Sequence, residues 1–212
     1  RIIPARYAST RFPAKALADI KGKSMVRRVY EQASKAGSLS KVVVATDHEK
    51  IFDHVKDFGE VVMTSAAHES GTDRCFEAFQ QLKGDYDYVI NIQGDEPYIR
   101  PEQIELLASC LVSSDVELAT LVKKITDKET LFNPNTPKVI FNKEKEAIYF
   151  SRQTIPYLRG IPPDEWLKKN DFYKHIGIYA YRTDILKKIT QFKISDLEKA
   201  EALEQLRWLE NG

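Results

Sequence analysis

Residues 93–97 read Gln-Gly-Asp-Glu-Pro, and they directly follow the apolar run Tyr-Val-Ile-Asn-Ile at 88–92. Five strand-forming residues that end at a glycine and two carboxylates predict a buried strand that delivers an acid to the edge of a sheet. In open α/β sheets, ligands bind just outside the carboxyl ends of the strands. Asp95 is therefore expected where a metal ion or a phosphate-bearing substrate would bind. The alternative is that Asp95 and Glu96 only cap a helix that begins near Pro101.

The start of the chain favours a binding site over a helix cap. An apolar strand at 2–3 is followed by a loop that carries Arg6, Arg11 and Lys15 together with two hydroxyl side chains. Such a loop after the first strand of an α/β unit suits a polyphosphate, because Arg offers a rigid fork of donors and Lys a mobile point charge. It is not a Walker A loop, since Leu17 stands where that motif needs its first glycine, and no G-x-G-x-x-G follows a strand.

The first half of the chain alternates strand and helix patterns, which predicts βαβ units and a parallel, doubly wound sheet. We expect strands at 2–3, 42–46, 61–63, 88–92 and 118–122, and helices at 25–36, 49–58, 70–82 and 101–112. The second half predicts a hairpin of 139–141 with 147–150, an exposed loop over 159–170, a strand at 176–181, and helices at 183–190 and 196–209. The expected architecture is one α/β domain, residues 1–212, with an antiparallel insertion at approximately 133–182.

Composition narrows the class of protein. The 212 residues include 32 basic and 31 acidic side chains, so a net charge of +1 offers no global attraction to nucleic acid or membrane, and anion binding must be local. No stretch approaches the roughly 20 apolar residues of a membrane span. Cys75 and Cys110 lack metal or redox spacing, and we expect both to be small core residues of a cytosolic protein. A first residue other than Met and a helix-stop signal at Asn211-Gly212 predict a sequence truncated at both ends.

Seven motifs together carry a resemblance to a known family. They are ARYASTRFPAK at 5–15, ATDH at 45–48, SGTDR at 70–74, NIQGDEP at 91–97, FSR at 150–152 with IPY at 155–157, HIGIYAYR at 175–182 and LEQLRWLENG at 203–212. In this order they resemble the 3-deoxy-manno-octulosonate cytidylyltransferases, or CMP-Kdo synthetases, over nearly the whole chain. The resemblance implies a Rossmann-like nucleotidyltransferase with a mixed, mostly parallel sheet flanked by helices.

The resemblance also implies an activity and its partners. Members of the family transfer CMP from CTP to the anomeric oxygen of the acidic sugar Kdo and release pyrophosphate, with Mg²⁺, for lipopolysaccharide biosynthesis. We therefore expect a cytoplasmic enzyme with CTP and Kdo as substrates and no nucleic-acid or membrane partner. Family members are usually homodimers formed partly through the inserted antiparallel strands, so we expect a homodimer here.

Residue roles follow from the same resemblance. Lys15 and Asp95 are expected to be catalytic, and Asp95 to hold the metal. The expected CTP-binding residues are Arg6, Ser9, Lys15, Ser70 and Arg74. The expected sugar-binding residues are Gln93, Arg152, His175, Glu204 and Gln205.

The chain departs from the family pattern at two places. Ala14 stands where relatives commonly have glycine, so Lys15 is retained but the backbone freedom of a glycine is lost. The family's second metal-binding carboxylate follows the final helix, beyond Gly212, so its identity is not given by this sequence.

Several interpretations stay open at this level. Asp47 either faces the binding edge or caps a helix from Glu49, whereas Asp73 fits helix-start chemistry. His54 is expected on a solvated helix face. The same reaction on another acidic sugar, such as an 8-amino Kdo analogue or a sialic acid, is the nearer alternative function. A non-catalytic nucleotide-binding module is the other, and the basic loop with Asp95 argues against it.

Overall fold

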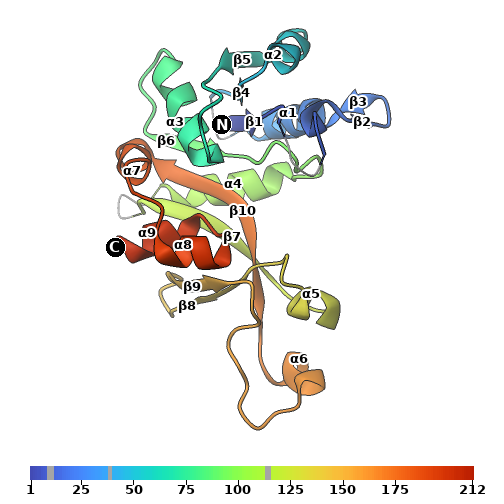
Figure 1. The fold of residues 1–212 in the computed structure, drawn as a ribbon, viewed down its shortest axis with the longest axis vertical. Coiled ribbons are helices and arrows are strands. Elements are labelled where there is room, and N and C mark those ends of the chain that lie inside the picture. The colour runs from blue at the N-terminus through green and yellow to red at the C-terminus, as the bar shows by residue number, and fades with distance from the viewer. Residues whose placement is uncertain (9–11, 38–39, 113–115) are drawn as a thin grey trace. The chain divides into compact units, whose positions relative to one another are not determined.

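The computed structural model describes residues 1–8, 12–37, 40–112 and 116–212, and the chain forms two compact units (Figure 1). The first unit comprises Arg1–Thr120 and Gly177–Thr190, and the second comprises Leu121–Ile176 and Gln191–Gly212. Every helix of the described residues is too short or too polar to cross a bilayer.

The sheet of the first unit is mixed and mostly parallel, as the sequence predicts. Strand β1 (Ile2–Ala5) pairs in parallel with β4 (Val43–Thr46) and β6 (Tyr88–Asn91), and β4 pairs in parallel with β5 (Glu60–Met63). Strand β10 (Tyr173–Arg182) runs antiparallel to β6 and also pairs with β7 (Leu118–Lys124). The central strands carry apolar side chains on both faces because helices cover the sheet.

Helices follow the strands as the alternation predicts. The first unit contains α1 (Met25–Lys35), α2 (Glu49–Lys56), α3 (Gly71–Gln81), α4 (Pro101–Cys110) and α7 (Thr183–Ile189). The first three begin at polar caps, since the side chains of Ser24, His48 and Ser70 each accept a hydrogen bond from a first-turn amide. Helix α3 packs on β1, β4 and β6, which places its first turn beside the ends of these strands.

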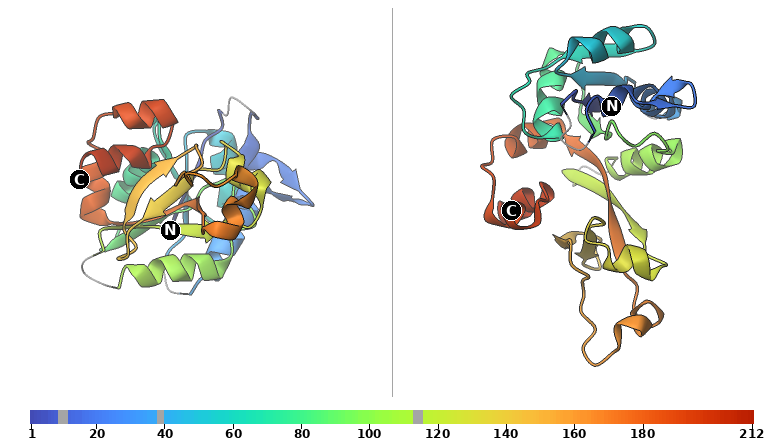
Figure 2. Two further views of the ribbon diagram at one scale, coloured as in Figure 1. Left: turned by 90° about the horizontal axis from the view of Figure 1, so that it is seen from below. Right: turned by 45° about the vertical axis from the view of Figure 1, so that its right-hand side comes forward.

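The second unit is built on the predicted hairpin, β8 (Lys138–Phe141) with β9 (Ala147–Ser151). It also contains α5 (Lys128–Phe132), η2 (Pro163–Glu165), α6 (Trp166–Lys169), α8 (Asp196–Glu201) and α9 (Gln205–Glu210). The segment between β9 and β10 forms a long excursion that carries α6 (Figure 2). One apolar cluster of this unit joins Val139 and Phe150 of the hairpin to Leu203 and Leu206.

Two expectations for the second half are wrong. The segment 159–170 is not simply an exposed loop, because Trp166 is buried among Ile125, Leu131 and Phe172. The expected helix at 196–209 is two helices, α8 and α9, and its interruption lies at Ala202, whose φ is 49°. Packing of Leu203 and Leu206 against the hairpin outweighs the helix propensity of the local sequence.

Three local features of the first unit also differ from expectation. Cys110 is exposed, whereas Cys75 is buried as expected. His54 does not lie on a solvated face, since its Nε2 is 2.7 Å from Ser24 Oγ and its ring packs against Phe58. A short hairpin of β2 (Asp19–Ile20) and β3 (Lys23–Ser24) was not predicted.

Candidate functional site

The candidate site lies at the edge of the first unit where four parallel strands end. Parallel strands present their carboxyl ends at one edge of a sheet, and polar segments follow β1, β4, β5 and β6 there. The turn at 93–97 can approach β1 closely because position 94 is glycine. A Cβ at Gly94 would lie 2.6 Å from the carbonyl oxygen of Pro4, which is shorter than any allowed contact.

Lys15 and Asp95 meet at this edge. The Lys15 Nζ lies 2.6 Å from Asp95 Oδ2, and the two side chains are 40% and 49% exposed. Lys15 opens the short helix η1 (Lys15–Leu17) after the basic loop, and Asp95 follows β6. The sequence-predicted cation and acid therefore lie in contact although 80 positions separate them.

The basic loop reaches this position through an unusual backbone conformation. Ala14 has φ 54° and ψ 28°, the left-handed region that L-residues avoid. Its amide donates to the carbonyl of Tyr7 at 3.0 Å and closes the loop. Ala14 therefore adopts a conformation that glycine would adopt more easily. Arg6 is exposed next to Tyr7, whereas Ser9 lies outside the described residues.

Ser70 is the N-cap residue of α3. Its Oγ accepts the amide hydrogen of Asp73 at 3.1 Å and lies 2.8 Å from Asp73 Oδ2. Asp73 therefore contributes to the helix start, as its position in the sequence suggests. This structure uses the Ser70 hydroxyl as a helix cap, and its predicted contact with CTP stays a prediction.

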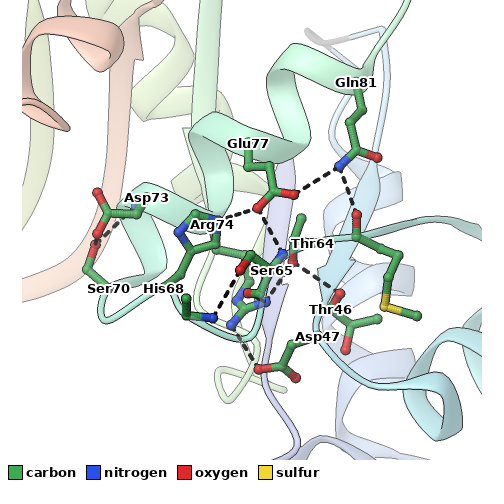
Figure 3. Close-up of polar contacts among 12 residues, drawn as sticks. Thr46, Asp47, Thr64, Ser65, His68, Ser70, Asp73, Arg74, Glu77 and Gln81 are labelled. Carbon is green, nitrogen blue, oxygen red and sulfur yellow. Dashed lines mark hydrogen bonds and ion pairs between the residues drawn. The ribbon is translucent and has the colours of Figure 1, made fainter.

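Arg74 lies in the centre of a buried polar network (Figure 3). Its Nη2 contacts Asp47 Oδ2 at 2.9 Å, while Nη1 donates to Thr64 Oγ1 at 2.6 Å and to the carbonyl of Ser65 at 3.2 Å. The side chains of Arg74 and Asp47 are only 3% and 11% exposed. The resemblance implies that Arg74 contacts the nucleotide, but the sequence does not indicate that Asp47 is its carboxylate partner.

Asp47 does not cap α2, so that alternative is wrong. His48 is the cap residue, with its Nδ1 accepting the amide hydrogen of Lys50 at 3.1 Å. Asp47 Oδ1 instead accepts the amide hydrogen of Tyr7 at 3.1 Å. The Tyr7 ring stacks on His48 with centroids 3.9 Å apart. The segments that follow β1 and β4 are thus joined by both polar and aromatic contacts.

Glu77 holds the segment that follows β5 against α3. Its Oε2 accepts the amide hydrogen of Ser65 at 2.9 Å and also contacts His68 Nε2 (Figure 3). Partial burial acts to raise the pKa of Glu77, but the hydrogen bonds from Ser65 and His68 hold it below its usual value. Glu77 is therefore an anion at neutral pH and orders this segment beside Arg74.

The expected sugar-binding residues divide between the two units. Gln93 is half-buried in the first unit, and the second unit carries Arg152, His175, Glu204 and Gln205.

In the second unit, the guanidinium of Arg152 is already bonded to the backbone. Its Nε, Nη1 and Nη2 donate to the carbonyls of Glu201 at 2.5 Å, Pro134 at 3.1 Å and Ala202 at 3.0 Å. A guanidinium has five N–H groups, so these three bonds leave donors for a ligand. Arg152 thus anchors the segment immediately before α9.

His175 is uncharged at neutral pH, because burial lowers its pKa to about 4. Its ring packs edge-on against Phe150 with centroids 5.0 Å apart. A neutral imidazole can hydrogen-bond to a sugar hydroxyl but supplies no positive charge to a carboxylate.

Gln205 has an unmet hydrogen-bonding requirement. The residue is buried, and its Nε2 has no hydrogen-bond partner among the described residues. Leaving a buried amide donor unpaired costs about 1–3 kcal/mol, which an acceptor on a ligand would offset.

Lys138 is a charged residue that the sequence analysis missed. It is fully buried in β8, and its Nζ donates to the carbonyls of Asn133 at 2.9 Å, Thr136 at 2.8 Å and Arg152 at 2.7 Å. Burial lowers the pKa of this lysine, and the nearby carboxylate of Glu201 opposes that shift. In the sequence, Lys138 cannot be told apart from a solvent-exposed lysine of a strand. No local signal identifies the three carbonyl groups to which it donates.

Asp95 is the candidate ligand for a divalent metal ion among the described residues. They contain no group of three or more His, Cys, Asp and Glu side chains placed to hold one. Mg²⁺, however, is commonly held by one or two carboxylates together with substrate phosphates and water. Asp95 fits that pattern because it is a half-exposed hard oxygen ligand at the strand edge, beside a cation suited to phosphate.

Comparisons with known proteins identify the family of this chain. Residues 1–212 match the family model described as cytidylyltransferase. The 3-deoxy-manno-octulosonate cytidylyltransferase of Cytophaga hutchinsonii is 61% identical over 213 residues, covering 100% of this chain and 85% of the relative. The corresponding protein of Parabacteroides distasonis is 57% identical over 216 residues, with the same coverage.

A solved structure extends the likeness to three dimensions. It is described as CMP:2-keto-3-deoxy-manno-octonic acid synthetase complexed with CTP, and it is 42% identical with a TM-score of 0.91. The match covers 100% of this chain and 85% of that one. A cytidylyltransferase from Leptospira borgpetersenii, 18% identical with a TM-score of 0.56, shares the fold over 93% of this chain and 65% of its own. This chain therefore belongs to the cytidylyltransferase family.

Proposed function

We propose that this chain transfers CMP from CTP to the anomeric hydroxyl of Kdo, giving CMP-Kdo and pyrophosphate for lipopolysaccharide biosynthesis. The observation that carries the proposal is the contact of Lys15 with Asp95 at the strand edge of a chain 61% identical to a 3-deoxy-manno-octulosonate cytidylyltransferase. A cation for phosphate and a carboxylate for a metal ion are the two groups that this chemistry requires there.

Nucleotidyl transfer depends mainly on positioning and on stabilising charge at the phosphates. Arg6 and Lys15 bind the triphosphate, and Ser9 belongs to the same loop. Ser70 and Arg74, at the start of α3, are proposed to contact the nucleotide. Asp95 would hold Mg²⁺, which would supply neutralisation of charge on the triphosphate.

The proposed sugar-binding residues are Gln93 in the first unit and Arg152, His175, Glu204 and Gln205 in the second. Arg152 offers its remaining N–H groups to the Kdo carboxylate, and the neutral His175 contacts a hydroxyl. The unpaired Nε2 donor of Gln205 supports a role in donating a hydrogen bond to a sugar oxygen, with Glu204 adjacent on the chain. We place the enzyme in the cytoplasm as a homodimer, with 133–182 contributing to the dimer. Exposure of Ile148 and Tyr157 in that segment supports an apolar contact there.

The test is pyrophosphate release from CTP and Kdo in the presence of Mg²⁺. The parallel reactions contain a sialic acid or an 8-amino Kdo analogue in place of Kdo, and UTP or ATP in place of CTP. Release with CTP and Kdo at the highest kcat/KM supports the proposal. Higher kcat/KM with another acidic sugar would reassign the acceptor, and CTP binding without release would indicate a non-catalytic module.

A further inference from the structure

The carboxylate of Asp47 joins two chain segments that are distant in sequence. Its Oδ1 accepts the amide hydrogen of Tyr7 at 3.1 Å, and its Oδ2 contacts Arg74 Nη2 at 2.9 Å. Tyr7 follows β1 in the basic loop, and Arg74 lies in the first turns of α3. One carboxylate therefore fixes both the phosphate-binding loop and the start of the helix that faces the nucleotide.

The network continues from Arg74 to the segment after β5. Arg74 Nη1 donates to Thr64 Oγ1 at 2.6 Å, and the same hydroxyl donates to the carbonyl of Thr46 at 3.1 Å (Figure 3). Thr46 is the last residue of β4 and directly precedes Asp47. The segments after β1, β4 and β5 and the helix α3 are thus held by one connected set of bonds.

Burial makes this set depend on the charge of Asp47. The Arg74 side chain is 3% exposed, and Asp47 is the carboxylate that contacts its guanidinium in the described residues. Removing one partner of a buried ion pair leaves the other charge uncompensated, and the surrounding backbone must move to let in water or another partner. Here the backbone that would move is that of the nucleotide site.

We propose that Asp47 is a positioning residue for CTP. It holds Tyr7, and therefore its neighbour Arg6, in register with Arg74 before the nucleotide binds, and it does not itself touch CTP. The inference rests on the proposed function, because it assigns Asp47 to the nucleotide half of that site. A displacement of about 1 Å at a binding group can reduce turnover about a hundredfold, so an arrangement held in advance has a measurable effect.

The test is Asp47→Asn, which keeps the shape of the side chain and removes its charge. We expect the KM for CTP and the Kd for CTP with Mg²⁺, measured by calorimetry, to rise about tenfold. The KM for Kdo should stay within about twofold, because the contacts of Asp47 in the described part of the chain are with Tyr7 and Arg74 and not with the proposed sugar-binding residues. A purely structural role would instead lower the fraction of active protein and change neither KM.

A matched control is the ion pair of Glu198 and Arg207 in the second unit. Its side chains are 13% and 8% exposed, and Arg207 Nε lies 2.6 Å from Glu198 Oε2. Glu198→Gln should therefore lower the melting temperature as Asp47→Asn does but keep the KM for CTP. An equal rise in the KM for CTP in both variants would overturn the inference, because general destabilisation would then explain it.

A second variant covers the case in which Asp47→Asn does not fold. Asp47→Glu keeps the negative charge but lengthens the side chain, so it should fold and raise the KM for CTP about threefold. A folded Asp47→Glu or Asp47→Asn protein with unchanged Kd and KM for CTP would overturn the inference. Failure of the parent protein to release pyrophosphate would overturn the proposed function instead, while CTP binding would still test Asp47.

Discussion

The Lys15 ammonium and the Asp95 carboxylate lie 2.6 Å apart and form an ion pair at the carboxyl edge of the sheet. Because both are about half exposed, the free energy of this contact is small, on the order of 0–1 kcal/mol. The proposed ligands of these two side chains, a phosphate for Lys15 and a metal ion for Asp95, would therefore separate the pair at little cost.

Asp95→Asn tests the metal-binding carboxylate. We expect kcat at saturating CTP and Kdo to fall at least about a hundredfold, because charge stabilisation at the phosphates is lost. Titration with Mg²⁺ should show a weaker apparent affinity, and thermal unfolding should be unchanged. Asp171→Asn is the control, since Asp171 forms an exposed ion pair with Lys124 at the same distance of 2.6 Å. Near-normal turnover in Asp95→Asn would remove Asp95 from the metal site.

Lys15→Ala tests the phosphate-binding cation. The KM for CTP should rise or kcat should fall about tenfold or more, because a charge-assisted bond to phosphate is lost. The free energy of unfolding should change by less than about 0.5 kcal/mol, as is usual for an exposed side chain. Lys124→Ala provides the matched loss of an exposed lysine. If Lys15→Ala matched that control in both kinetic constants, the basic loop would be an ordinary solvated surface.

Ala14→Gly should stabilise the protein. The left-handed conformation at φ 54° costs an L-residue about 1–2 kcal/mol, and glycine loses about 0.5–1 kcal/mol of that gain to its greater freedom when unfolded. We expect a net gain of roughly 0.5–1 kcal/mol in the free energy of unfolding, measured by urea denaturation. Ala33→Gly in the interior of α1 is the opposite control and should destabilise by about 1 kcal/mol. A loss of stability in Ala14→Gly would contradict the strain argument.

Arg152→Ala should affect both stability and sugar binding. Three carbonyl oxygens lose their donor, so the free energy of unfolding should fall by about 1–3 kcal/mol. In the folded fraction, the KM for Kdo should rise far more than the KM for CTP, and Arg152→Lys should restore only part of it because the planar fork is lost. Equal changes in the two KM values would assign Arg152 to the scaffold alone.

His175 should make stability depend on pH. Its folded pKa of about 4 lies below the unfolded value of 6.5, because burial disfavours the charged ring. The unfolded state therefore binds more protons between these values, and the contribution of His175 to stability is complete above pH 6.5 and is lost as pH falls toward 4. The fall in unfolding free energy over this interval should be smaller in His175→Gln. Parallel curves for the two proteins would show that His175 is accessible to protons in the fold.

Much of the first unit was predictable because its signals are local. Alternating apolar runs and helix caps place the strands and helices, and the rule for parallel sheets brings Lys15 to Asp95. The partners of Asp47 were not predictable, because a carboxylate after a strand has the same sequence appearance whether it caps a helix or binds a buried arginine. Trp166 and Ala202 were mispredicted for a related reason. Their conformations depend on apolar clusters formed by residues that are distant in sequence. The polar loop around Trp166 and the helix-forming residues around Ala202 give no local signal of that packing.

Three backbone carbonyl oxygens, of Asn133, Thr136 and Arg152, surround the ammonium group of Lys138. They form the kind of oxygen cage that loops in many proteins offer to a bound inorganic cation, but here the cation is tethered to the chain. It cannot be chelated, exchanged or diluted away. The positive charge that these three carbonyls surround is therefore supplied by the chain itself.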